Sequence, residues 1–301
     1  MTTYPSSTFF SAPPEWGWLI VLYFFFGGLA GGCYFLAVLI DFFGRDEDRP
    51  LARLGYYISF PCIVISGLLL TLDLTRPLRF WHMLIESNTY RPMFKYWSPM
   101  SVGSWGLLIF GIFALLSFLG ALAEDNRLAW PAGRRIRPPT MLGRIIGLIG
   151  GIFGFYVAGY TGVLLAVTNR PIWSDTPLLG MLFVVSAASI SAALMILLAQ
   201  RSRWTMPGLA ALHRMDTWVV ALEFLVLIAV MLSLGPVFRA WLNAWGLLLF
   251  FGVIVVGMLI PLALFWRRDW LGGRNVTTAA ALVLVGGFIL RLVIVFSAQG
   301  V

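Results

Sequence analysis

Residues 16–40 read WGWLIVLYFFFGGLAGGCYFLAVLI and contain no charged side chain. A helix needs roughly 20 mostly apolar residues to cross the hydrocarbon core of a bilayer. Because backbone N–H and C=O groups in lipid must be satisfied within the segment, this stretch predicts a transmembrane helix and not a strand. Its small residues, Gly27, Gly28, Gly31 and Gly32, recur four apart, a spacing that lets neighbouring helices approach closely.

The same pattern recurs along the chain, which is 60% hydrophobic and only 11% charged. In soluble domains roughly a quarter of the residues are charged, so this composition excludes a soluble domain. Two stretches must each tolerate one ionisable residue, Glu223 in 217–238 and Arg291 in 275–298. We expect an all-α integral membrane protein. The five other charge-free stretches are 54–72, 96–123, 145–169, 176–200 and 240–266, which brings the expected number of transmembrane helices to about eight.

The helices predict one membrane domain over residues 1–301. Four helices (16–169) followed by four (176–298) are expected to form two bundles. Pro61 and Pro261 lie inside two of the helices, where kinks are expected.

The basic residues predict how the protein is oriented. The first, third, fifth and seventh connections between helices hold 14 of the 21 Lys and Arg residues, whereas the termini and the other connections hold six. By the positive-inside rule, both termini lie outside, which in a bacterial inner membrane is the periplasmic side. Residues 1–15 contain no basic residue, so no cleavable signal peptide is predicted. The net charge of +8 lies in short clusters between apolar runs, which indicates lipid headgroups and not nucleic acid as the partner.

One connection, residues 73–95, places basic residues outside against this rule. It contains Arg79, His82, Arg91 and Lys95 together with several aromatic side chains. One interpretation is an amphipathic segment at the membrane interface. The interpretation that we favour is a docking surface for a partner or a substrate, because such a surface needs these charges.

Several polar groups are expected at one outer level of the membrane. The topology places Tyr23, Asp73, Tyr160 and Arg291 there, from four different helices. Ionisable groups within spans cost roughly 2.5–3.5 kcal/mol on insertion scales, so they mark functional sites. An ion pair of Asp73 with Arg76 or Arg291 would be a structural explanation; a polar pocket open to the outer leaflet is the favoured one.

Glu223 lies about two turns into its helix from the cytoplasmic side, beyond Asp216. Two interpretations stay open. The carboxyl is either a hydrogen-bonded structural group or one step of a proton path from the cytoplasm.

The sequence lacks the residues that hold common redox centres. It has two histidines, His82 and His213, and neither is within a bundle where a b-type haem needs two axial ligands. Cys33 and Cys62 lie in the middle of two helices; free thiols are favoured over a disulfide there. No metal-ligand spacing or nucleotide-binding loop is present. Any redox cofactor must therefore belong to a partner or be a diffusible membrane molecule.

Several segments, in order along essentially the whole sequence, resemble the membrane subunit family of polysulfide reductase and formate-linked nitrite reductase, called the NrfD or PsrC family. They are Glu15-Trp16-Gly17-Trp18, Leu72-Asp73-Leu74-Thr75-Arg76-Pro77, Ser98-Pro99-Met100-Ser101, Gly159-Tyr160-Thr161-Gly162, Asn169-Arg170-Pro171, Glu223 and Leu290-Arg291-Leu292-Val293.

The resemblance implies two four-helix bundles, no haem, and a menaquinone or ubiquinone site near the outer face. It also implies a ferredoxin-like partner that carries [4Fe-4S] clusters, with a molybdopterin or multihaem catalytic subunit beyond it. By motif, Asp73, Arg76 and Tyr160 are the positions carried over. Where some members have a histidine in the first helix, this sequence has Tyr23.

These residues suit quinol oxidation, which releases two protons and two electrons. Our hypothesis is that Asp73 accepts a proton, that Arg76 keeps it ionised, and that Tyr160 or Tyr23 hydrogen-bonds a ring oxygen. Two other function classes remain: a transporter or ion-conducting protein that uses the same polar cluster, and a passive anchor for a soluble enzyme.

Overall fold

The computed structural model describes residues 15–201, 208–266, 270 and 274–299. Within these ranges eight helical segments are long and apolar enough to cross a membrane, and no β-strand is found. The predicted all-α membrane fold is thus confirmed. Seven crossings are single helices: α1 (Trp18–Phe43), α2 (Arg49–Asp73), α3 (Pro99–Glu124), α4 (Met141–Ala166), α5 (Leu179–Arg201), α6 (Leu209–Ser233) and α9 (Asn275–Ser297). The N-terminal residues 1–14, for which no cleaved signal was expected, lie outside the described residues.

The remaining crossing consists of three consecutive pieces, α7 (Ala244–Leu248), the π-helix η6 (Leu249–Leu259) and α8 (Ile260–Trp266). Pro261 is the second residue after the π-helix, so the irregularity expected at this proline lies on its N-terminal side. By contrast, α2 continues through Pro61 as one helix. π-Helices are rare and are found disproportionately at functional sites.

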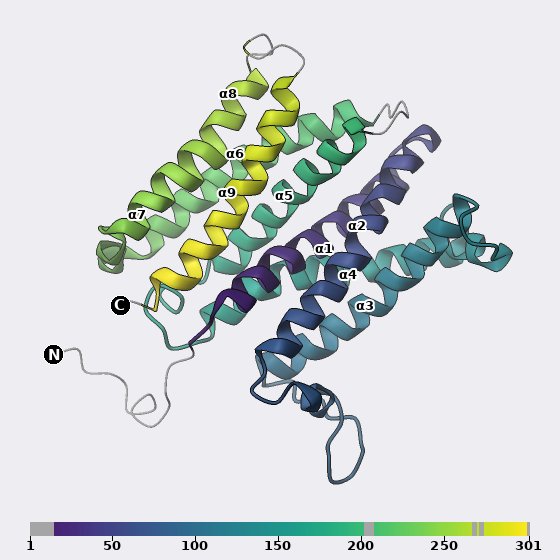
Figure 1. Cartoon of the computed structure of the whole chain (residues 1–301), viewed down its shortest axis with the longest axis horizontal. Coiled ribbons are helices and arrows are strands. Elements are labelled where there is room, and N and C mark those ends of the chain that lie inside the picture. Colours follow the sequence, from purple (N-terminus) through teal and green to yellow (C-terminus); the bar gives the residue numbers. More distant parts are fainter. Residues whose placement is uncertain (1–14, 202–207, 267–269, 271–273, 300–301) are drawn as a thin grey trace.

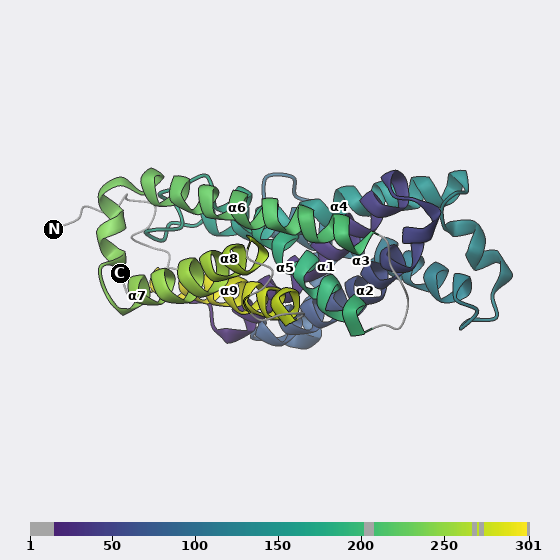
Figure 2. The ribbon, with the colours of Figure 1, turned by 90° about the horizontal axis from the view of Figure 1, so that it is seen from above.

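The helices run side by side, and the start of α1 and the end of α9 lie at the same end of the bundle (Figure 1). We call this end the terminal face; it comprises residues 15–17, 74–98, 167–178, 234–243 and 298–299. The other end is the opposite face. In the view from above, α6 covers one side of the second half of the molecule (Figure 2).

The central helices are α1 and α5. In their most apolar windows they are 72% and 61% buried, compared with 33% for α6. α1 contacts α2, α4 and α5, and α5 contacts α1, α4, α6 and α9. The division into two four-helix bundles stays a prediction, because α1 and α5 join the two halves directly.

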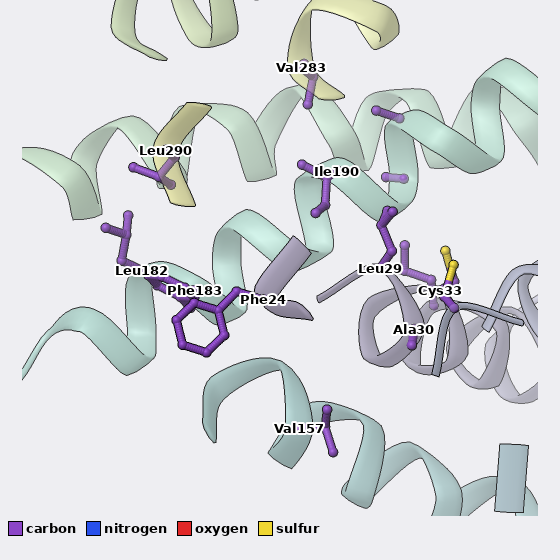
Figure 3. Close-up of a cluster of buried hydrophobic side chains, with 14 of the residues drawn as sticks. Phe24, Leu29, Ala30, Cys33, Val157, Leu182, Phe183, Ile190, Val283 and Leu290 are labelled. Atoms are coloured by element: carbon purple, nitrogen blue, oxygen red, sulfur yellow. The ribbon is translucent and has the colours of Figure 1, made fainter. Parts of the chain in front are cut away.

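The glycines of α1 make this central packing possible. A Cβ atom on Gly31 would collide with the carbonyl oxygen of Gly154 in α4, and one on Gly32 would lie 2.6 Å from the carbonyl oxygen of Ala187 in α5. Figure 3 shows the apolar side chains that α1 contributes around these contacts. Cys33 and Cys62 are buried free thiols, as predicted.

An ion-pair network closes the first half of the molecule at the opposite face. The Arg137 guanidinium lies 2.8 Å from the Asp41 carboxylate of α1 and 3.1 Å from that of Glu124 in α3. Arg53 of α2 contacts Glu124 at 2.9 Å and Asp125 at 2.7 Å. Burial by itself lowers the pKa of Arg137, but its anionic neighbours outweigh burial and raise that pKa above its ordinary value.

The network also explains why two helices extend beyond the charge-free stretches. α1 ends at Phe43, past Asp41, and α2 begins at Arg49, so Arg53 lies within it. A helix can continue through charged residues beyond the hydrocarbon core when those residues form ion pairs there.

Candidate functional site

Three tyrosines from α1 and α4 lie together near the terminal face. The Tyr160 hydroxyl donates a 2.7 Å hydrogen bond to the carbonyl oxygen of Pro99, the first residue of α3. The ring of Tyr156, one helical turn away, has its centroid 5.5 Å from that of Tyr160. The Tyr23 hydroxyl is close enough to both for electrostatic interaction. Two predicted site residues, Tyr23 and Tyr160, are therefore brought together.

Glycines of α3 allow the two rings of α4 to lie against its backbone. A Cβ atom on Gly103 would overlap the Tyr160 ring, and one on Gly106 would overlap the Tyr156 ring. Side chains at these positions would displace the tyrosines. The α3 glycines thus fix the positions of both phenol rings.

The Tyr23 hydroxyl differs from that of Tyr160. The Tyr23 side chain is only 2% exposed, yet its hydroxyl makes no hydrogen bond to any described residue. A phenol hydroxyl can donate one hydrogen bond and also accept, and buried polar groups are normally paired. Tyr23 therefore presents an unused donor in an aromatic environment, which is suited to the oxygen atom of a planar ligand.

Asp73 lies next to the terminal face and Arg76 lies on it, but they do not form the ion pair that was the alternative explanation. Asp73 is the last residue of α2, and both side chains are exposed. No ion pair joins them, because the backbone leaves the helix in an extended conformation at Leu74, and the i,i+3 proximity of a continuous helix is lost. Asp73 also forms no contact with Tyr160 in the described part of the protein. Its place in the site stays a prediction.

Arg291 does not form the ion pair with Asp73 that was the alternative explanation. It is 1% exposed between α1, α5 and α9. Its Nε donates to the carbonyl oxygen of Phe24 at 3.2 Å, and its Nη1 donates to the Ser186 hydroxyl at 3.0 Å and to the carbonyl oxygen of Gly287 at 2.7 Å. Its Nη2 has no hydrogen-bond partner among the described residues.

Glu223 of α6 belongs to the same buried group. The Ser186 hydroxyl also interacts with the Glu223 carboxyl, which lies within electrostatic reach of Arg291. A single serine of α5 thus connects the one acidic and the one basic residue that the sequence placed within spans. The hydrogen bond from Ser186 and the charge of Arg291 both favour the ionised form of Glu223.

Asp216 lies two helical turns before Glu223 on the same face of α6. It is fully buried, and neither of its carboxylate oxygens has a hydrogen-bond partner within the described residues. Seven residues along a helix correspond to about 10 Å, and the two carboxyls still interact electrostatically. The structure thus keeps a row of two ionisable groups inside the second half of the molecule.

The segment Pro77–Ser98 carries the predicted docking residues. Arg79, Arg91 and Lys95 are exposed and form no ion pair within the described ranges, and His82 is half-buried with its ring 3.8 Å from that of Trp81. Exposed apolar side chains accompany these cations. They are Leu78, Phe80, Ile85, Tyr90, Phe94, Tyr96 and Trp97. Figure 1 shows this segment projecting from the terminal face beyond α2 and α3.

Two participants were missed by sequence reasoning. Tyr156 precedes Tyr160 by four residues, a spacing that puts both on one side of a helix, so periodicity offered a signal. Ser186 offered none, because a serine in an apolar helix is common and its bridging position depends on α6 and α9.

The sequence matches the family model described as polysulphide reductase, NrfD, over residues 6–301. It is 28% identical to the C chain of polysulfide reductase from Wolinella succinogenes, over 94% of each protein. It is also 28% identical to protein NrfD of Escherichia coli, over 94% of this sequence and 95% of that protein. The C subunit of tetrathionate reductase from Salmonella typhimurium is 27% identical over 65% of this sequence and 53% of its own.

Proposed function

Since the chain belongs to the polysulphide reductase NrfD family, we propose that it exchanges electrons between a membrane quinone and an iron–sulfur partner subunit. Membership makes it a multi-pass membrane subunit of a reductase-type complex, with a catalytic subunit as partner. The quinone site, the partner's clusters and the orientation in the membrane are our proposals.

The observation that carries the proposal is the hydroxyl of the buried Tyr23 side chain, which lies near Tyr156 and Tyr160 and has no hydrogen-bond partner among the described residues. A menaquinone or ubiquinone supplies two-electron, two-proton chemistry when bound. Tyr23 donates a hydrogen bond to a ring oxygen, while the two rings of α4 bound the headgroup on one side. Tyr160 orients this wall through its own hydrogen bond to Pro99.

Asp73 is proposed as the group that takes up protons. It is an exposed carboxyl at the same face, so a proton that it accepts leaves readily to water. Since no ion pair with Arg76 supports it, Arg76 is assigned to the aqueous edge of the site and not to holding Asp73 ionised.

We further propose that the terminal face is periplasmic in a bacterial inner membrane, as the distribution of Lys and Arg predicts. The Pro77–Ser98 segment then docks a ferredoxin-like [4Fe-4S] subunit, beyond which lies a molybdopterin or multihaem subunit. The unpaired charges of Arg79, Arg91 and Lys95 support docking of an acidic surface. The aromatic side chains around them supply apolar contact area.

The second half supports a coupled proton movement. Asp216 and Glu223 form the proposed path from the opposite face towards Arg291. A passive anchor would not need a fully buried carboxylate that lacks partners among the described residues. A transporter remains the alternative from another class; proton or ion flux that continues without any quinol would favour it.

Replacing Tyr23 by Phe tests the quinone site most directly. The lost hydroxyl has no partner in the described part of the protein, so folding and assembly should be unchanged. One hydrogen bond is worth about 0.5–1.5 kcal/mol, so we expect the KM for quinol of the complex purified from membranes to rise about 2- to 13-fold. The exposed Tyr96→Phe is the matched control. An unchanged KM in the Tyr23 variant would contradict the proposed site.

Replacing Asp73 by Asn tests the proton acceptor. Quinol-dependent reduction of the partner should be abolished, while the partner still co-purifies with the membrane subunit. Undiminished turnover would rule out the role of Asp73 without affecting that of Tyr23.

A further inference from the structure

An apolar cavity of about 440 Å³ lies in the second half of the molecule at the terminal face. Its volume is within the range of small-molecule sites, roughly 300–1,000 Å³. No residue of the tyrosine group or of the Glu223–Arg291 group lines it. The principal lining side chains are Met231 of α6, Phe238 and Trp241 of the connecting 3₁₀-helix η5 (Gly235–Trp241), Leu247 of α7, and Phe250 and Ile254 of η6.

The cavity results from the way the backbone turns between two membrane crossings. Gly235 has a positive φ of 51°, a conformation that favours glycine, and ends α6 in a sharp turn into η5. α6 contacts α5 extensively but touches η6 and α8 at few points. The wall opposite α6 is the π-helix, so the gap coincides with the rarest secondary structure in the described residues.

Among the described lining side chains, only the amide nitrogen of Asn243 is left as a polar atom for a quinone headgroup. The Trp241 Nε1 donates a 2.9 Å hydrogen bond to the Ser297 hydroxyl. The Asn243 side-chain oxygen accepts from the backbone N–H groups of Trp245 and Gly246. No titratable group is among the described residues that line the cavity. The chemistry that matches such a lining is a hydrocarbon tail.

The residues around the cavity can accommodate the headgroup of a ligand that carries such a tail. Leu242 and Leu247 are 74% and 61% exposed at the cavity, as expected of a surface that faces lipid. Arg239 lies on η5 between the lining residues Phe238 and Trp241. It is exposed, and its guanidinium has no ion-pair or hydrogen-bond partner in the part of the protein that the structure describes. Arginine beside an apolar crevice at the interface suits a lipid phosphate.

We propose that this cavity binds one membrane glycerophospholipid, with an acyl tail between α6 and η6 and its phosphate at Arg239. The lipid occupies the gap that α6 and η6 leave between them and so holds α6 against the rest of the second half. A ligand that binds only the folded state stabilises it by mass action. The site is separate from the proposed quinone site, so either proposal can fail alone.

Photocrosslinking tests the acyl-tail site. The complex is reconstituted in nanodiscs with phosphatidylglycerol that carries a diazirine in its acyl tail, and labelled peptides are identified by mass spectrometry. Labelling of Met231, Phe250 and Ile254 should exceed labelling of the lipid-exposed Leu222 and Leu225 of α6 at least 5-fold. Equal labelling of the two sets, or displacement of the label by excess menaquinone, would overturn the proposal.

Two kinds of variant test the binding sites of the acyl tail and of the phosphate separately. Ile254→Trp fills the cavity and should remove the excess labelling; Leu247→Trp, at a more exposed position, serves if the first variant fails to fold. Arg239→Gln should lower the amount of lipid retained in native mass spectrometry several-fold and leave quinol turnover unchanged. Lipid retention equal to wild type in Arg239→Gln, or excess labelling that persists in a folded cavity-filling variant, would refute the assignment.

Discussion

Two groups of charges in the described part of the protein are organised in opposite ways. At the opposite face of the first half, Arg137, Asp41, Glu124 and Arg53 satisfy one another at 2.8–3.1 Å. Inside the second half, Asp216 has no hydrogen-bond partner among the residues that the structure describes.

This difference distinguishes charges that stabilise the fold from charges that do not. A buried charge without a partner is costly, and breaking a buried pair costs about 3–5 kcal/mol. The first group lies at the ends of its helices and joins three of them, so its charges stabilise the structure. The second group lies within apolar spans where neutral residues would cost less, so stability does not explain it, and we propose that it serves proton movement.

The largest effect is expected for Arg137→Ala. The substitution leaves the Asp41 carboxylate buried and without its cation, so the free energy of unfolding should fall by about 3–5 kcal/mol. Thermal unfolding of the purified protein in detergent measures this loss. Arg135→Ala, at an exposed neighbouring position, is the control. A loss below about 1 kcal/mol, the range of exposed pairs, would remove the structural role of the network.

The opposite sign is expected for Asp216→Asn. No hydrogen bond to a described residue is lost, while a buried carboxylate disappears, so the free energy of unfolding should rise by about 1–3 kcal/mol. In proteoliposomes the same variant should oxidise quinol but move fewer protons. Destabilisation by Asp216→Asn would show that the two groups of charges do not differ as argued, and intact proton movement would exclude Asp216 from the path.

Tyr160 and Tyr23 show the same contrast between a paired group and a group unpaired among the described residues, with a smaller expected difference in the free energy of unfolding. Tyr160→Phe removes the hydrogen bond to Pro99 and should lower the free energy of unfolding by about 0.5–1.5 kcal/mol. Tyr23→Phe removes a hydroxyl that has no partner among the described residues and should change stability by less than about 0.5 kcal/mol. Chemical denaturation of both variants under one condition gives the comparison. Equal losses would mean that Tyr23 is a structural residue.

A small effect is also expected at the edge of the network. Arg49 is 3.6 Å from Asp46 and from Glu124, and its side chain is 27% exposed. Solvent-exposed pairs contribute about 0–1 kcal/mol. Arg49→Gln should therefore cost at most about 1 kcal/mol, and raised salt should diminish the difference in melting temperature from wild type. A loss as large as that of Arg137→Ala would show that exposure does not set the strength of these pairs.

The membrane class, the positions of the crossings and the family could all be predicted from the sequence. Each of these follows from local properties: a charge-free run of about 20 residues must be a helix in lipid, and motifs are read directly from the residues. The glycine run of α1 also predicted close packing correctly. The sequence did not predict that α1 would extend past Asp41, since that depends on Arg137, which is far away along the sequence.

Which polar residues contact one another could not be predicted without the packing of the helices. Depth in the membrane placed Arg291 at the level of Asp73, but depth says nothing of the direction in which a helix presents a side chain. The packing of α9 against α1 and α5 turned Arg291 towards Ser186 and Glu223. Likewise, the α3 glycines brought Tyr156 into the tyrosine group. Contacts between separate helices depend on rotation and packing, which arise only when all the helices are assembled.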